Sequence, residues 1–68
     1  MTLKKGERVR VVADWIASED KQRRAAVQSQ QKHGQLFFVK IRWVGADSQR
    51  LEETYGTLFE ESELRKVG

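Results

Sequence analysis

Gln35 to Val44, with the sequence QLFFVKIRWV, is the stretch that decides the fold of this 68-residue chain. Apolar and polar residues alternate along it, which places on one face Phe37, Val39, Ile41 and Trp43. Alternation with a period of two, in residues that are β-branched or aromatic, predicts a β-strand with one buried face. The opposite face also holds apolar residues, among them Leu36 and Phe38, so we expect a central strand partly covered on both sides, or one that bends across two layers.

A shorter alternation precedes this strand and predicts a first strand. After Gly6, the residues of one parity are Val9, Val11, Ala13 and Trp15. The other parity carries Arg8 and Arg10. This pattern is typical of a half-buried strand.

The segment between these two strands permits two structures. One is a helix over residues 19–33, with Ser18 as its N-cap and Gly34 at its C′ position. The other is a polar loop over residues 18–23, a strand over Arg24–Gln31 and a hairpin turn into the main strand. The apolar residues of the segment are Ala25, Ala26 and Val27. A helix with so small an apolar face has little to bury, so we favour the loop and the hairpin.

A turn and a second ambiguous segment follow the main strand. Gly45 begins a turn cluster, and residues 51–59 alternate again. The same residues also fit helical spacing, with Asp47 or Ser48 as a cap. We favour a strand, because Gly56 inside a helix would cost about 1 kcal/mol and the neighbouring threonines prefer strands.

Size and composition limit how the domain is stabilised. The chain holds no cysteine and a single histidine, His33, which excludes disulfides and leaves no ligand set for zinc. One domain over residues 1–68 therefore relies on an apolar core, with self-association as a homodimer as a further source of stability. We expect the core to form around Trp15, Phe37, Phe38, Trp43, Tyr55 and Phe59.

The order of the predicted elements ends with a helical turn and a last strand at Arg65–Val67. This order resembles the small Src-homology-3-like β-barrels, and among them the Tudor, Agenet and KOW type. The resembling stretches, within Lys4 to Val67, are Gly6-x-x-Val9-x-Val11, Ala26-Val27, Val39-x-Ile41-x-Trp43 and Ser62-Glu-Leu-Arg-Lys-Val. The resemblance implies an all-β barrel of about five strands with a short helical turn before the last one.

Two departures from that family concern its function. The loop Ile16–Arg23 is long and charged, and the glycine-led motif of KOW modules does not occur. Barrels of this type bind nucleic acids, bind peptides or serve as scaffolds, so the resemblance predicts the fold better than the activity.

Basic residues concentrate in the first part of the chain. Residues 1–42 contain ten Lys or Arg and four Asp or Glu, residues 43–68 contain three and six, and the net charge is +3. A basic surface attracts phosphate backbones or an acidic protein partner. We expect a face that binds DNA or RNA, made of Arg8, Arg10, Arg23, Arg24, Lys32, Lys40 and Arg42. Trp15 and Phe38 are candidates for base stacking or for contact with a partner.

The sequence offers little for catalysis, for a cofactor or for a metal. His33 lies in a predicted turn, the isolated glycines form no phosphate-binding loop, and a solvated face is the expected role of Glu60, Glu61 and Glu63. We therefore expect a binding module that is not an enzyme. The alternative function is protein–protein interaction, or a role as an accessory subunit, through exposed aromatic residues.

The beginning of the chain lacks the apolar stretch of a signal peptide. The longest apolar run, Leu36–Val39, is far shorter than the ~20 residues that span a bilayer. We expect a cytoplasmic protein without membrane contact.

Overall fold

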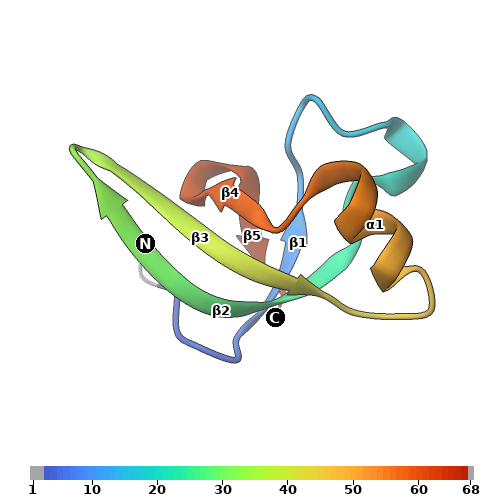
Figure 1. The fold of residues 1–68 in the computed structure, drawn as a ribbon, viewed down its shortest axis with the longest axis horizontal. Helices are drawn as coiled ribbons and strands as arrows, with labels where there is room; N and C mark the ends of the chain where they lie inside the picture. Colours follow the sequence, from blue (N-terminus) through green and yellow to red (C-terminus); the bar gives the residue numbers. More distant parts are fainter. Residues whose placement is uncertain (1–2, 68) are drawn as a thin grey trace.

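The computed structural model describes residues 3–67 and shows an antiparallel sheet of five strands with one α-helix (Figure 1). The strands are β1 (Arg8–Val11), β2 (Arg24–His33), β3 (Leu36–Trp43), β4 (Leu58–Glu60) and β5 (Leu64–Lys66). The helix α1 is Ser48–Tyr55, and two short 3₁₀ turns are η1 (Ser18–Asp20) and η2 (Glu61–Glu63). The order β4-β3-β2-β1-β5 confirms the predicted β-rich fold. Residues 1, 2 and 68 of the predicted domain lie outside the described residues.

The β2–β3 hairpin confirms the predicted hairpin, and the alternative helix over residues 19–33 is wrong. β2 continues to His33, two residues beyond the predicted end, and the predicted loop contains the 3₁₀ turn η1. Gly34, with a φ of +65°, forms the turn between the two strands. Ala25 and Val27 pair with residues of β3 and are buried. Two small apolar residues at alternate positions are enough for one buried row of a sheet, although they are too few for the buried face of a helix.

A β-bulge interrupts β2. The register shifts between Val27 and Ser29, which leaves Gln28 as an extra residue opposite β3. Bulges bend a strand and increase its twist. Strand β4 pairs with Phe38, Val39 and Lys40 of β3. The hairpin of β2 and β3 extends beyond this pairing, so the tip of the hairpin protrudes from the sheet (Figure 1).

The segment after the Gly45 turn corrects the prediction of a strand over residues 51–59. Ser48–Tyr55 is helical, and only Leu58–Glu60 is extended. Gly56, with a φ of +78°, directly follows the last helical residue, so the cost of a glycine inside a helix does not arise. The helix places Leu51 in the core.

The buried apolar side chains form a single core of Leu3, Val9, Val11, Ala13, Ile16, Ala25, Val27, Val39, Ile41, Trp43, Leu51, Phe59 and Leu64. Of the predicted core aromatics, Trp43 and Phe59 are buried, whereas Phe38 and Tyr55 are partly buried. Placing Trp15 and Phe37 in the core was wrong, because they are 54% and 45% exposed. Phe37 lies on the protruding end of the hairpin. Strand β1 ends at Val11, so the alternation of buried residues does not continue to Trp15.

The two edge strands of the sheet are neighbours in the chain. Only η2 separates β4 from β5, and it is the helical turn predicted before the last strand. β5 itself, at Leu64–Lys66, begins one residue earlier than predicted. The sheet curls around the core, with β5 behind β3 and β4 in the view of Figure 1.

Replacing Trp43 with alanine should destabilise the domain by about 3–5 kcal/mol, because it opens a cavity in the core. Trp43 is 3% exposed, and its Nε1 donates a hydrogen bond to the Gly56 carbonyl oxygen at 2.8 Å. Urea unfolding followed by circular dichroism measures the change. The matched control is Phe37→Ala on the same strand, which should cost less than about 1 kcal/mol. Equal losses in the two variants would contradict this core.

Candidate nucleic-acid interface

Two cross-strand rows of basic residues lie on the outer surface of the sheet, the surface that faces away from the core. In the first row, Arg10 of β1 lies between Arg24 of β2 and Arg65 of β5. In the second row, Arg8 of β1 and Arg42 of β3 flank Ala26 of β2. Residues that pair directly in an antiparallel ladder point to the same side, so each row presents its charges together.

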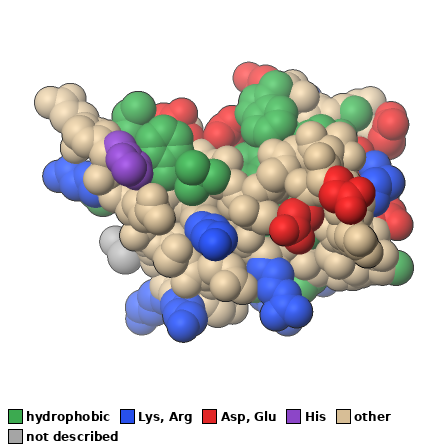
Figure 2. Space-filling model, viewed as in Figure 1, with side chains coloured by type: hydrophobic (Ala, Val, Ile, Leu, Met, Phe, Trp, Pro, Cys, Tyr) green, Lys and Arg blue, Asp and Glu red, His purple; other side chains and the backbone are tan. Residues whose placement is uncertain are grey.

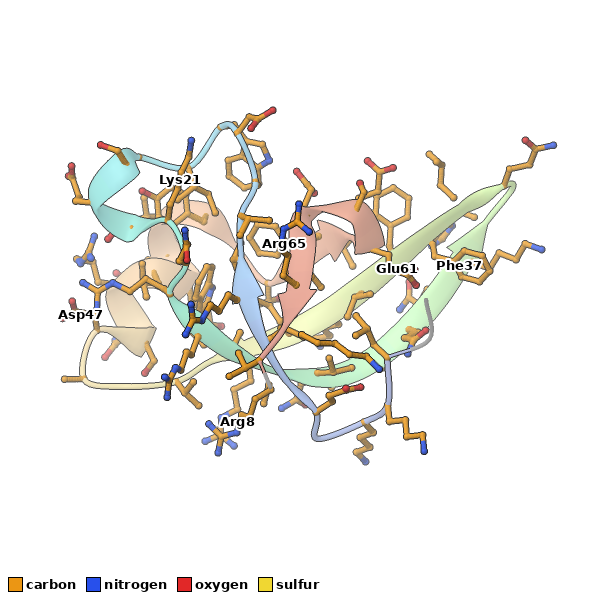
Figure 3. The ribbon with its side chains drawn as sticks, turned by 180° about the vertical axis from the view of Figure 1, so that it is seen from behind. Arg8, Lys21, Phe37, Asp47, Glu61 and Arg65 are labelled. Atoms are coloured by element: carbon orange, nitrogen blue, oxygen red, sulfur yellow. The ribbon has the colours of Figure 1, made fainter. Side chains whose placement is uncertain are left out.

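Lys40 extends the second row along β3, because it lies two residues before Arg42 and faces the same side. We call the following residues the basic band: Arg8, Arg10, Arg24, Lys40, Arg42 and Arg65. The band follows the curl of the sheet around the molecule. Lys and Arg side chains gather on the lower part of the face in Figure 2, and Arg8 and Arg65 are seen from behind in Figure 3.

The charges of the basic band have no acidic partner within residues 3–67. The ion pairs of this part of the chain involve Arg23, Arg50 and Lys66, and none involves a residue of the band. Arg10 Nη1 donates a hydrogen bond of 3.4 Å to the neutral side chain of Gln22. Like charges directly opposite each other destabilise a sheet, so the rows carry an electrostatic cost that no direct ion pair among the described residues offsets.

Two of the predicted binding residues lie apart from the band. Arg23 Nη2 is 3.2 Å from Asp47 Oδ2, in a cluster of ion pairs beside α1. Lys32 pairs with Phe37, and its Nζ lies 5.5 Å from the centre of that ring, on the side of the hairpin opposite to Lys40. The structure therefore brings together the other five predicted residues.

Sequence reasoning missed Arg65, the sixth residue of the band. Arg65 lies in the last part of the chain, where acidic residues outnumber basic ones, and the charge pattern therefore did not indicate it. The available signal was the alternation in β5, which turns Leu64 into the core and Arg65 outward.

The bulge residue Gln28 lies among the cations of the band. It lines a hollow of about 430 Å³ together with Arg8 and Arg42, and a neighbouring hollow together with Lys40. Bulges often occur beside functional sites because they redirect a side chain. Here the redirected group is a carboxamide, which can both donate and accept hydrogen bonds.

The two aromatic residues predicted for stacking lie in different surroundings. Trp15 stacks on Phe59, with 5.4 Å between the ring centroids, and its Nε1 donates a hydrogen bond of 2.7 Å to Glu63 Oε2. It also lines a hollow with the carboxylates of Asp14 and Glu60, and Arg65 of the band lines the same hollow. Phe38 instead shares the outer surface of β3 with Lys40.

Apolar side chains surround Phe38 on the hairpin and β4. We call this group, with the histidine beside it, the hairpin patch: His33, Leu36, Phe38 and Leu58. Leu36 and Leu58 are half exposed, and the His33 and Phe38 rings meet at 70° with their centroids 5.6 Å apart. Leu58 pairs directly with Lys40, so the hairpin patch is continuous with the basic band. Figure 2 shows hydrophobic side chains beside the histidine, above the basic ones.

A buried carboxylate ties the loop after β1 to α1. Asp20 is 2% exposed, and its two oxygens accept hydrogen bonds from Arg50 at 2.8 and 3.3 Å and from the Tyr55 hydroxyl at 2.7 Å. We call these three residues the Asp20 lock. The bonds from Arg50 and then Tyr55 lower the pKa of Asp20, and the same contact raises the pKa of Tyr55. Sequence analysis did not find this lock, because its members are far apart in the chain.

No helix of residues 3–67 has both the length and the apolar character needed to cross a membrane. In the same range no group of three or more His, Cys, Asp or Glu side chains is arranged to hold a metal ion.

Comparison of the chain with protein-family models, with curated proteins and with solved structures gives no match.

The Asp20 lock should make the domain sensitive to acid. Because folding lowers the pKa of Asp20, its contribution to stability is present above the unfolded-state value of 3.8 and is lost as the pH falls through the lower folded-state value. Asp20→Asn should lower the melting temperature at neutral pH by roughly 10 °C or more and flatten the acid dependence. Thermal melts from neutral to strongly acidic pH measure both. Asp14→Asn, at an exposed carboxylate, should follow the wild-type curve, and identical curves for the two variants would refute the lock.

Proposed function

We propose that this domain is a non-catalytic nucleic-acid-binding module and that the basic band is its binding surface. The observation that carries the proposal is the row of three arginines, Arg65, Arg10 and Arg24, in directly paired positions without a carboxylate partner among the described residues. Such a row does not stabilise the fold, since like charges in paired positions oppose folding. A polyanion bound along the rows would offset this repulsion, because its negative charges attract the arginines of both rows.

The separation of charge over the molecule supports a polyanionic ligand. Several acidic side chains have internal partners: Asp20 and Asp47 bind Arg23 and Arg50, and Glu7 binds Lys66. The cations of the band form no ion pair among the described residues, and they lie in two rows across the adjacent strands β3, β2, β1 and β5. Backbone phosphates of DNA or RNA satisfy such a surface with little dependence on sequence, and binding releases counterions.

We further propose that the curled sheet is a Src-homology-3-like barrel of the Tudor, Agenet or KOW type. Supporting this are the order of the elements and the short connection between the edge strands β4 and β5 through η2. The fold proposal is separate from the binding proposal, because such barrels carry several functions.

Fluorescence anisotropy with labelled oligonucleotides tests the binding proposal. Arg8→Gln/Arg42→Gln removes two charges of the band and should weaken binding roughly tenfold at low salt. It should also reduce the slope of log affinity against log salt concentration by about 2, one for each lost phosphate contact. The matched control is Lys21→Gln/Lys32→Gln, which changes the net charge equally outside the band and should bind as the wild type.

The same titration discriminates against the alternative functions. Equal affinity of the two double variants, or no binding of the wild type at low salt, would contradict the proposal. Polyglutamate serves as the competitor that represents an acidic protein partner. Competition by polyglutamate as strong as by an oligonucleotide of equal charge would favour the protein partner instead.

A further inference from the structure

The outward-facing residues of β3 combine cations with an aromatic ring in one line. They are Leu36, Phe38, Lys40 and Arg42. Alternate residues of a strand are about 7 Å apart, so Phe38 lies about 7 Å from Lys40 and about 13 Å from Arg42 along the strand. A ligand that contacts the basic band through these two cations therefore also reaches the hairpin patch.

The cross-strand neighbours of Phe38 are polar, and the apolar residues of the patch lie along β3 and diagonally to it on β4. In the sheet it lies between Gln31 of β2 and Glu60 of β4. The Glu60 carboxylate accepts a hydrogen bond from the backbone of Glu63 in a capping box, which holds this negative charge at the start of η2. The His33 ring lies at 70° to the Phe38 ring, so the two rings together form a corner of the patch.

Duplex and single-stranded nucleic acids differ in what they can offer such a surface. In a duplex the base faces are stacked on one another and are not available to a ring on a sheet. A single strand presents its charged backbone and its base faces together, and proteins bind it with basic grooves and aromatic stacking platforms. Exposed Leu36 and Leu58 beside the ring add apolar contact area for bases.

A second copy of the chain fits this surface less well. A symmetric contact through the hairpin patch would bring the adjoining cations of both copies to the same interface, because Lys40 pairs directly with Leu58 of the patch. Like charges brought together at an interface oppose association. The continuity of the patch with cations that form no ion pair among the described residues instead matches an anionic ligand with apolar faces.

Building on the proposed function, we infer that the ligand of the basic band is a single-stranded polynucleotide and that Phe38 stacks against one of its bases. Single-stranded DNA and RNA share the required chemistry. Lys40 and Arg42 contact the backbone, and Gln28 lies beside them where it can bond to a base edge.

The test compares two adjacent phenylalanines that face opposite sides of β3. Phe38→Leu removes the ring from the hairpin patch and keeps an apolar side chain, and Phe37→Leu makes the same change on the other side. Anisotropy is measured with oligo(dT), oligo(rU) and a duplex of the same length, and thermal melts verify that both variants are folded. We expect the wild type to bind one or both single strands more tightly than the duplex. Phe38→Leu should weaken single-strand binding by roughly 5- to 100-fold, whereas Phe37→Leu should bind as the wild type.

Several outcomes would overturn the inference. Tighter binding of the duplex, or equal affinities of the two leucine variants for single strands, would exclude stacking on Phe38 while leaving the basic band as a binding surface. Absence of binding to every oligonucleotide would instead refute the proposed function itself. Sedimentation velocity provides the last criterion: a wild-type dimer that Phe38→Leu converts to a monomer would assign the hairpin patch to a second copy.

Discussion

The antiparallel ladder between β2 and β3 is the interaction on which the rest of the structure depends. β1 joins the sheet by pairing with β2, and β4 joins it by pairing with β3. The inner face of the ladder supplies Ala25, Val27, Val39, Ile41 and Trp43 to the core. The outer face of the same two strands carries half of the basic band and three of the four residues of the hairpin patch. One register therefore determines both the packing and the proposed binding surface, since a slip by one residue would exchange the two faces.

Acidic and basic residues have different roles in this small domain. Several carboxylates hold the structure together: Asp20 fastens the loop to α1, Glu63 binds Trp15, and Glu7 binds Lys66. A buried carboxylate is costly unless it is paired and hydrogen-bonded, and Asp20 meets that condition through Arg50 and Tyr55. The band arginines take no part in such contacts within the described residues. The unequal use of charge thus carries the proposal of a binding surface further than the modest net charge does.

Sequence alternation predicted the elements whose burial follows a simple period. β3, the hairpin and the final strand belong to this group, and so do five of the band residues, which occupy the outward positions of predicted strands. The helix α1 was missed because Gly56 was treated as a residue inside a helix, although it ends one. Trp15 and Phe37 were misplaced because parity says which side a residue faces and does not say whether anything covers that side. The Asp20 lock depends on contacts between distant segments, which a local pattern cannot show.

The topology of the sheet also has a consequence for the order in which the chain assembles. The hairpin joins neighbours in the sequence across the Gly34 turn, so little chain entropy is lost when it closes. β1 and β5 instead come from opposite ends of the chain, with Val11 paired to Leu64. We therefore expect β2 and β3 to form early in folding and β5 to join the sheet last. Arg65 completes the first row of the basic band only at that step, so the three arginines come together when the β1–β5 ladder closes and not before it.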